Sequence, residues 1–240
     1  MARNPKNRFV RSCFVAVIFV IALFLSFSLL PAAHAAEKCL RIGMPEIYTD
    51  QRGIEPYRTV MAEAGLCVQP VPMPNARSVL AIRRGDIDGL FAAVNDLPDL
   101  AGVAVVRGKV TLGNVKGLLI VRSGDVSGIG DLKDELLGIW LGETWSKDLI
   151  ASYPNVIGVP RGPQMMQQML REGRLDAMLM DAYSLKISGG VPDGYKGIPI
   201  ADIVVHSWLR AEFAEFLPKL DEGTRAYQKK LLALSREPRP

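Results

Sequence analysis

A short pattern that occurs twice constrains the fold more than any other feature of the chain. The first copy is L-A-I-R-R-G-D-I-D-G-L-F at residues 80–91, and the second is M-L-R-E-G-R-L-D-A-M-L at residues 169–179. Each copy indicates the last turn of a helix, a Gly, two further residues, an Asp and a buried strand. Gly suits the helix end because it adopts the left-handed conformation, and basic residues just before it complement the helix dipole. Two such units predict two similar α/β lobes with a cleft between them.

The first 35 residues have the three parts of a secretory signal peptide. An apolar run from Cys13 to Leu30 is broken by Pro31 and followed by the small-residue cleavage sequence A-H-A at 33–35. The basic residues that precede the run are Arg3, Lys6, Arg8 and Arg11. We expect cleavage after this segment and export to the periplasm. An uncleaved anchor is the alternative, since the run approaches the length of a membrane span.

Without this segment, the chain has a formal net charge of zero. The full sequence has a formal net charge of +4 and a pI of about 9.0. The segment holds four of the 29 basic residues and none of the 25 acidic ones, so 25 of each remain. Without a net basic field or a basic stripe, nucleic-acid binding is not expected. The remaining residues, about 205, suffice for two small lobes.

Two cysteines remain once Cys13 leaves with the signal segment. Cys39 precedes the first predicted strand and Cys67 precedes the second. The starts of neighbouring parallel strands lie side by side, and exported proteins meet an oxidising compartment, so we predict a disulfide. Two buried free thiols are the alternative. The absence of a C-x-x-C sequence argues against a thiol-redox site.

The hydrophobic patterning predicts alternating strands and helices, with a polar loop at 44–55 and turns at 123–130 and 189–197. A tail at 235–240 is predicted to be disordered. The predicted strands are 40–43, 67–71, 87–94, 103–106, 115–121, 137–141, 156–159, 177–180 and 200–205. The predicted helices are 56–64, 75–84, 144–151, 162–171 and 209–234.

Together, three sequences in an exported chain resemble the periplasmic solute-binding proteins of type II fold. They are C-L-R-I-G at 39–43, A-R-S-V-L-A-I-R-R-G-D-I-D-G at 76–89 and L-R-E-G-R-L-D-A-M-L-M-D at 170–181. The similarity is to family 3, the amino-acid-binding branch of the substrate-binding proteins of ABC transporters, and spans essentially the whole mature chain.

The resemblance implies an α/β fold of two lobes that close over a small ligand. Two crossover strands would join the lobes, at 116–122 and 200–205. Lobe 1 would comprise 36–116 and 204–240, and lobe 2 would comprise 117–203. Amino-acid binders of this family usually carry an Arg after the third strand that clamps the ligand carboxylate. This chain has N-D-L-P-D-L at 95–100, with two acids and no Arg.

Ligands of open α/β sheets bind beyond the carboxyl ends of the strands. In lobe 1 this rule selects Glu46, Tyr48, Asn75, Arg77 and Asn95. In lobe 2 it selects Thr144, Trp145, Ser146, Arg161, Asp181 and Tyr183.

Arg77 is the most specific candidate. With Asn75 as the helix N-cap, Arg77 would lie in the first turn, where a cation costs about 0.3–1 kcal/mol against the helix dipole. A bound carboxylate or phosphate would compensate, so we expect Arg77 to face Trp145 and Ser146 across the cleft. Solvation, or pairing with Asp86 or Asp88, is the alternative. Arg161 would be the counterpart in the second lobe, or a surface residue.

The remaining candidates have simpler alternatives. Thr144 and Ser146 would hold an anion at a helix start while Trp145 stacks on the ligand, or they would only cap the helix. Asp181 and Tyr183 would hold an ammonium or hydroxyl group, or Asp181 would cap a helix. Glu46 and Tyr48 have the same two alternatives, a contact with the ligand or a structural role.

Catalysis has little support in the sequence. His206 is the one histidine beyond the signal segment, and the chain has no metal-ligand cluster, G-x-S-x-G sequence or P-loop. We expect no enzyme activity, no cofactor and no metal. The predicted function is a monomeric solute-binding protein that closes over a small polar or anionic metabolite and presents it to a membrane transporter or sensor.

Two alternatives remain open. A dehydratase-type enzyme on the same fold would need a buried acid or base in the cleft, and Glu46, Glu143 and Asp181 are the available residues. An accessory module that binds another protein would have a degenerate cleft, lined by Leu and Val instead of polar groups.

Overall fold

Eight strands form one mixed sheet in the computed structural model, which describes residues 39–234. The strand order is β2-β1-β3-β8-β4-β7-β5-β6. The strands are β1 (Leu40–Pro45), β2 (Val68–Met73), β3 (Gly89–Ala93), β4 (Val105–Arg122), β5 (Leu137–Trp140), β6 (Val156–Val159), β7 (Ala177–Asp181) and β8 (Tyr195–Arg210). The predicted signal peptide and the predicted disordered tail lie outside the described residues.

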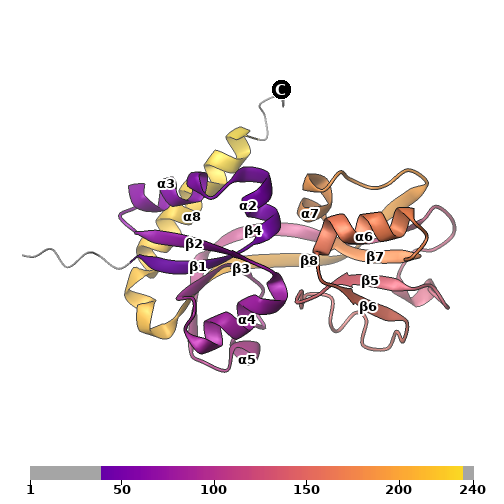
Figure 1. Cartoon of the computed structure of the whole chain (residues 1–240), viewed down its shortest axis with the longest axis horizontal. Coiled ribbons are helices and arrows are strands. Elements are labelled where there is room, and N and C mark those ends of the chain that lie inside the picture. Colours follow the sequence, from indigo (N-terminus) through magenta and orange to yellow (C-terminus); the bar gives the residue numbers. More distant parts are fainter. Residues whose placement is uncertain (1–38, 235–240) are drawn as a thin grey trace, which may run out of the picture. The chain divides into compact units, whose positions relative to one another are not determined.

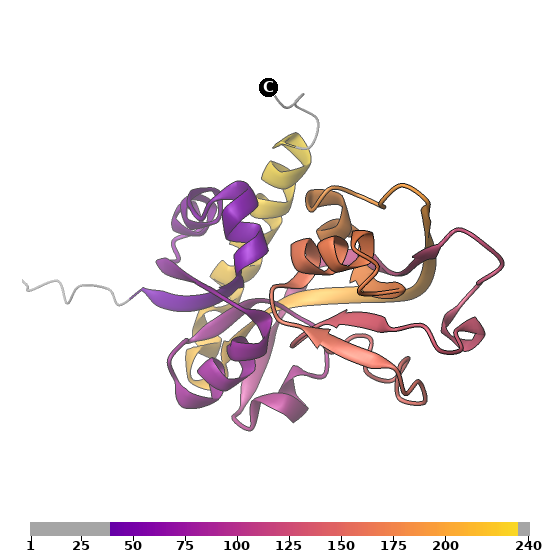
Figure 2. The ribbon, with the colours of Figure 1, turned by 45° about the vertical axis from the view of Figure 1, so that its right-hand side comes forward.

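Helices pack on both faces of this sheet. The α-helices are α2 (Glu46–Arg52), α3 (Glu55–Glu63), α4 (Asn75–Arg84), α5 (Leu97–Ala101), α6 (Gly162–Arg171), α7 (Ala182–Ile187) and α8 (Leu217–Leu234). Two 3-10 helices are η2 (Ile129–Asp131) and η3 (Ala211–Phe216). In Figures 1 and 2, α8 (yellow) lies beside α3 (indigo) on the same face of the sheet, and these two helices are in contact.

Two parallel groups of strands flank a long antiparallel pair. Strand β1 pairs in parallel with β2 and β3, and β5 pairs in parallel with β6 and β7. We call the first group with α2 to α5 and α8 the first lobe, and the second group with α6 and α7 the second lobe. Strands β4 and β8 pair with each other and with both groups (Figure 1). The predicted crossovers are confirmed as parts of β4 and β8, and the extended segments at 103–106 and 115–121 lie almost entirely within the single strand β4.

The duplicated pattern forms the same structure twice. Gly85 and Gly173 follow α4 and α6 with φ values of +75° and +69°, the left-handed conformation that favours glycine. Oδ2 of Asp88 accepts a hydrogen bond from the backbone nitrogen of Arg41 at 2.8 Å, which ties β3 to the start of β1. Oδ2 of Asp176 accepts one from the backbone nitrogen of Leu136 at 2.8 Å, just before β5. In both lobes the Asp therefore holds the beginning of the neighbouring parallel strand.

Asp88 also binds the side chain of Arg41. It is 3% exposed and receives hydrogen bonds from Arg41 Nη2 at 2.5 Å and Nε at 3.0 Å. This bidentate pair lies at the amino ends of the strands, away from the predicted cleft. Asp88 therefore serves the lobe structure and is not the partner of Arg77.

Each lobe has apolar cores on the faces of its part of the sheet. In the first lobe, the largest core contains Phe91 at the centre of a ring cluster with Tyr57 and Tyr227, whose centroids lie 5.2 and 5.7 Å away. In the second lobe, α6 packs Met166 and Leu170 onto the sheet, and both side chains are fully buried. The two cores are distinct clusters, and Ile47 of α2 in the first lobe packs into the cluster of the second lobe.

Several predicted elements need correction. The polar loop predicted at 44–55 contains α2, because Ile47 is buried and Tyr48 packs against core residues of both lobes. The helix predicted from residue 209 begins only at Leu217, because β8 continues to Arg210 through pairing of Trp208 with Leu90 of β3. The short helices α5 and α7 were not predicted.

Residues 144–151 form successive turns, and the predicted helix is absent from this part of the described chain. The ring of Trp145 lies against Gly117 of β4, and its indole nitrogen is bonded to Glu143. These tertiary contacts fix the segment in a conformation other than the one its local sequence favours. The expectation that Thr144 caps a helix is therefore wrong.

The disulfide between Cys39 and Cys67 is present, with the two Cα atoms 4.6 Å apart. Strands β1 and β2 begin next to these residues, and the backbone nitrogen of Leu40 donates to the Cys67 carbonyl at 3.0 Å. The prediction from matched strand starts is thus confirmed. None of the helices within residues 39–234 has the length and apolar character that crossing a membrane requires.

Candidate functional site

A cavity of about 200 Å³ lies at the carboxyl ends of strands from both lobes. It is closed laterally by the middle of the crossover strands, through Leu112 and Val115 of β4 and Ile203 and Val205 of β8. Typical pockets for drug-sized ligands occupy about 300–1,000 Å³. The volume therefore suits a small metabolite.

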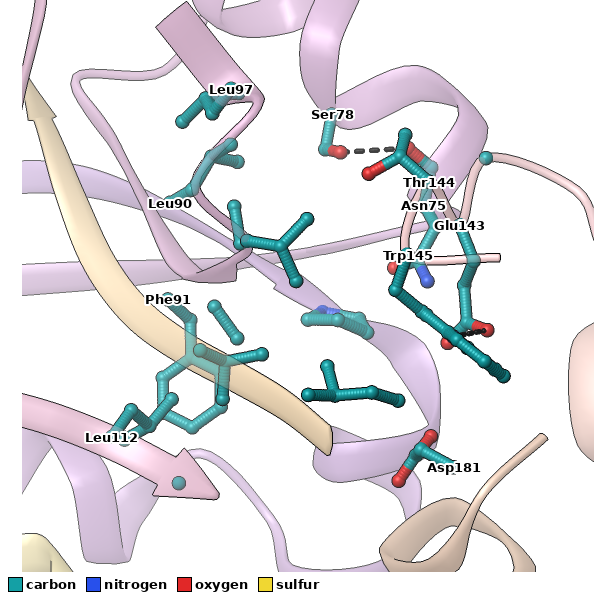
Figure 3. A pocket seen from close by; sticks show the side chains of 18 of the residues that line it. Asn75, Ser78, Leu90, Phe91, Leu97, Leu112, Glu143, Thr144, Trp145 and Asp181 are labelled. Carbon is teal, nitrogen blue, oxygen red and sulfur yellow. Dashed lines mark hydrogen bonds between the residues drawn. The ribbon is translucent and has the colours of Figure 1, made fainter. Parts of the chain in front are cut away.

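The two sides of the cavity differ in chemistry. Figure 3 shows Leu90, Phe91, Leu97 and Leu112 on one side and the polar residues opposite them. The polar lining residues are Tyr48, Asn75, Ser78, Asp96, Glu143, Thr144, Asp181 and Tyr183. Of these, Asn75, Glu143, Thr144 and Asp181 are seen together in Figure 3, opposite the apolar side chains. A ligand with one polar end and one apolar end would match both sides.

Aromatic rings link the two lobes at the polar side. The ring of Tyr48, from α2, stacks on that of Tyr183, from α7, with centroids 5.4 Å apart and planes 15° apart. Tyr48 also contacts Phe91 of β3 at a centroid distance of 5.4 Å. The stacked rings extend the apolar core of the first lobe as far as the wall of the cavity. They also join that core to the second lobe.

The lobes also meet at Gly142, in the turn after β5. Gly142 has a φ of +91° and lies so close to the backbone of Asn75 and Ala76 that a Cβ atom would overlap with them. A residue with a side chain would thus be strained in two ways, by its conformation and by this contact. Gly142 covers the amino end of α4 at the edge of the cavity.

Two acidic side chains from the second lobe line the polar side. Oε2 of Glu143 accepts a hydrogen bond from Trp145 Nε1 at 2.8 Å. Oδ1 of Asp181 accepts one from the backbone nitrogen of Ser184 at 2.8 Å, which caps α7. The alternative weighed for Asp181, helix capping, is confirmed, and the same side chain also lines the cavity.

Burial favours the neutral forms of these groups. Desolvation, and then the nearby charge of Asp181, raises the pKa of Glu143 to about 8. Desolvation also raises the pKa of Asp181, opposed by hydrogen bonds from Ser184. The pKa of Tyr48 is raised well above its usual value, mainly by desolvation and secondly by Asp181. The polar side can therefore bind or release a proton near neutral pH.

Among the described residues, no Lys, Arg or His lines the cavity, while Asp96 adds a third carboxylate. An anionic ligand would find no compensating cation there, and ionisation of the neighbouring carboxyl groups would place like charge beside it. Of the polar or anionic metabolite that the sequence suggests, the lining therefore disfavours the anionic alternative.

The structure brings six of the eleven predicted site residues to the cavity. They are Tyr48, Asn75, Thr144, Trp145, Asp181 and Tyr183. Glu46, Asn95 and Arg161 are exposed and lie outside the lining, and Asn95 accepts a hydrogen bond from Arg107 Nη1 at 2.6 Å. Ser146 is buried, at 2% exposure, but does not line the cavity either.

Arg77 does not line the cavity and is exposed. Helix α4 begins at Asn75, with Pro74 as the preceding extended residue, so Asn75 is not the N-cap. Arg77 is then the third helical residue. The expectation that Arg77 faces Trp145 and Ser146 across the cleft is not met in this structure.

The sequence reasoning missed two parts of the lining. The sequence analysis treats Glu143 only as a possible acid of an enzyme, although it lies in the turn region after β5 and so satisfies the strand-end rule. The apolar side was not anticipated because Leu90 and Phe91 are indistinguishable in sequence from ordinary core residues of a strand. Leu112 belongs to the part of β4 between the predicted strands 103–106 and 115–121, for which the patterning predicts no strand.

His206 lies in β8. His206 is buried, and its Nδ1 lies 3.1 Å from the Gly108 carbonyl oxygen. It is not part of the cavity lining. Within residues 39–234, no group of three or more His, Cys, Asp or Glu side chains is placed to hold a metal ion.

Comparison with known proteins identifies the fold. A mutant of ArgBP from T. maritima matches at 14% identity and a TM-score of 0.65, over 80% of this chain and 90% of that one. The chain has the type II periplasmic-binding-protein fold. A histidine-bound substrate-binding protein of an ABC uptake transporter from Streptococcus pneumoniae matches at 16% identity and a TM-score of 0.63, over 80% and 87%.

A third match is the ligand-binding core of GluR0 from Nostoc punctiforme, in complex with L-glutamate. The identity is 13% and the TM-score 0.65, over 82% of this chain and 96% of that one. No protein-family model matches the sequence, and no curated protein matches it. At these identities the comparisons establish the two-lobed fold, and the predicted fold class is confirmed.

Proposed function

We propose that the protein is an exported solute-binding protein of the family 3 type, which closes its two lobes over one small organic solute. It would present that solute to a membrane transporter or a sensor, acting as a monomer in the periplasm. Export rests on the signal-peptide pattern of residues 1–35. The structural neighbours support the role, since their descriptions include histidine-bound and glutamate-bound proteins.

The observation that carries this proposal is that residues from both lobes line the cavity. Tyr48 and Asn75 belong to the first lobe, and Thr144, Asp181 and Tyr183 belong to the second. A solute that contacts both groups would be bound more tightly by the closed arrangement than by an open one. Differential contact of this kind is what couples binding to closure.

A second candidate function is an enzyme on the same fold. Its specific support is Glu143, a carboxyl group facing the cavity with a pKa raised to about 8. An acid with a pKa near the working pH is suited to proton transfer. Turnover of candidate cyclic acids by the purified protein would favour this reading over simple binding.

The third reading, a degenerate cleft that serves protein binding, has the Leu and Val side of the cavity in its favour. The polar side weighs against it, since that side carries two carboxylates and two tyrosines. A cavity of about 200 Å³ also leaves little room for a peptide segment.

A thermal-shift screen of metabolites against the purified protein tests the proposed function. A ligand at 100 times its dissociation constant should add about 2.7 kcal/mol to the free energy of unfolding. Calorimetry of each hit should give a stoichiometry of one. If no solute in a broad metabolite set raises the melting temperature, the solute-binding proposal fails.

A further inference from the structure

We infer that the solute is an organic amine with an apolar body and no carboxylate group. This inference rests on the proposed function and deepens it by naming the chemical class of ligand. Its evidence is the charge of the lining, the cover over the amino end of α4, and the division of the cavity into a polar and an apolar side.

The polar side is suited to an ammonium group. Asp181 and Glu143 both line it, and the two groups are close enough for the charge of Asp181 to raise the pKa of Glu143. An ammonium group would donate hydrogen bonds to these carboxylates and neutralise them together. Tyr48 and Tyr183 line the same side, and aromatic faces attract cations.

The cavity offers no comparable place for a ligand carboxylate. Among the described residues that line it, none is basic, so no guanidinium or ammonium group is available. The amino end of α4 would be the remaining anion site, because its backbone N–H groups are not all used within the helix. Gly142 lies directly against Asn75 and Ala76 at that end and occupies the approach.

The neighbouring hydroxyl and amide groups do not make the cavity a suitable place for a ligand carboxylate. Oγ of Ser78 donates its hydrogen to the carbonyl oxygen of Asn75 at 2.7 Å. Thr144 and Asn75 could each supply a neutral hydrogen bond, which is weaker than a charge-assisted one. A ligand carboxylate would meet these groups within reach of two acidic side chains, and so would be less stable than in water.

The opposite side takes the apolar body. Leu90, Phe91, Leu97 and Leu112 face the cavity there (Figure 3). Burying an apolar group against them is favourable by about 25 cal/mol per Å². The volume of about 200 Å³ limits this body to roughly the size of a large amino-acid side chain.

Matched trios of compounds test the class directly. One trio is 2-phenylethylamine, L-phenylalanine and 3-phenylpropanoate, and a second is 3-methylbutylamine, L-leucine and 4-methylpentanoate. Within each trio the apolar body is constant while the amine or the carboxylate is removed. Calorimetry with the purified protein at pH 7.5 should show at least one amine binding about tenfold or more tightly than both of its carboxylate-bearing partners.

Two conservative variants test the recognising groups. Asp181→Asn keeps a good helix cap, and Glu143→Gln keeps an acceptor for Trp145. Asp181→Asn should weaken amine binding by about 10- to 100-fold, and Glu143→Gln should weaken it in the same direction. Asp125→Asn, an exposed residue with the same loss of charge, should leave the affinity unchanged.

The outcomes separate this inference from the proposed function. If an amino acid or a carboxylate binds as tightly as its amine, or if only solutes of another class give hits, the inference fails while solute binding stands. Amine affinity that is unchanged in Asp181→Asn also overturns the inference. If no solute binds at all, the proposed function fails first.

Discussion

Trp145 donates the hydrogen of its indole nitrogen to Glu143 across 2.8 Å, while its ring lies against Gly117 of β4. The indole thus connects a carboxyl group of the cavity wall to the crossover strand. This arrangement keeps Glu143 beside the cavity although the surrounding segment is a series of turns. A change in the protonation of Glu143 should therefore change the free energy of unfolding of the whole protein.

We expect the stability of the ligand-free protein to fall as the pH rises from about 4.5 to about 8. The folded-state pKa of Glu143 is about 8, above the ordinary value of 4.5, so the folded state binds more protons than the unfolded state over this range. The stabilisation is complete below the lower value and is lost as the pH passes the higher one. Asp181, whose pKa is also raised, acts in the same direction.

Urea unfolding of the wild type and of Glu143→Gln at a series of pH values measures this effect. At about 1.4 kcal/mol per pKa unit the full shift would correspond to about 5 kcal/mol. Because Glu143 is partly exposed to solvent, the wild type should lose about 1–3 kcal/mol more than the variant over that pH range. Parallel stability curves for the two proteins would contradict the assignment to Glu143.

Gly142→Ala should weaken solute binding by about tenfold or more. Its new methyl group would overlap with the backbone of Asn75 and Ala76 and so force the lobes apart. Gly190→Ala is a matched control, because Gly190 has a similar φ of +84° and nothing within 4 Å of its Cβ position. Both variants should lose about 1–2 kcal/mol of stability from the left-handed conformation.

Calorimetry with a solute identified in the screen measures the affinities of both variants. Equal affinity of Gly142→Ala and Gly190→Ala would show that the contact between Gly142 and Ala76 is irrelevant to binding.

Asp88→Asn should destabilise the protein more than Asp176→Asn, although both residues occupy the same place in the duplicated pattern. Asp88 is buried and binds both the backbone and the guanidinium group of Arg41, whereas Asp176 is exposed. We expect losses of about 2–3 kcal/mol and about 1 kcal/mol respectively. Thermal and urea unfolding give both values, and a reversed order would refute the assigned roles.

Reduction of the disulfide between Cys39 and Cys67 should cost about 3–4 kcal/mol of stability. The bond closes a loop with a sequence separation of 28 residues, and its removal increases the entropy of the unfolded chain. Unfolding of oxidised protein and of the Cys39→Ser/Cys67→Ser double variant measures the difference. Mass spectrometry of unreduced, alkylated protein should find neither cysteine labelled.

Arg77→Ala should leave solute affinity unchanged. Arg77 is exposed and outside the cavity lining, so its loss removes no side chain that faces the cavity. Calorimetry with the wild type as reference tests this expectation. An affinity loss of about tenfold or more would restore Arg77 as a ligand-binding residue.

The repeated unit could be predicted from sequence because its signals are local. The helix ends at Gly85 and Gly173 and the buried strands after them depend on backbone conformation and patterning within a few residues. The disulfide followed from the same local signals, since it joins two predicted strand starts. The prediction of two α/β lobes required only that these units occur twice in one chain, whereas the type II fold with its crossover strands followed from the family resemblance.

Other features depend on contacts between distant segments. Residues 144–151 have a helical pattern, but the contact of Trp145 with Gly117 holds them in turns. Trp208 continues β8 because it pairs with Leu90, which lies far away in sequence.

The candidate site was predicted only in part, because it also depends on contacts between distant segments. The strand-end rule found Tyr48, Thr144 and Asp181, which line the cavity. It could not decide which way a residue points within a first helical turn, and so it also selected Arg77.

The continuous pairing of β4 with β8 has a mechanical consequence. Because backbone hydrogen bonds run along both strands from one lobe to the other, the cavity cannot open by rotation about two free linkers. Opening must instead bend the two paired strands, β4 and β8, together. The register of this pair shifts between Arg107 and Thr111, between Thr111 and Gly113, and between Gly117 and Leu118, so the bend would concentrate at those three places. Leu112 and Gly113, at the second of these shifts, line the cavity, so a bound solute would stiffen the paired strands at a point where their register is irregular.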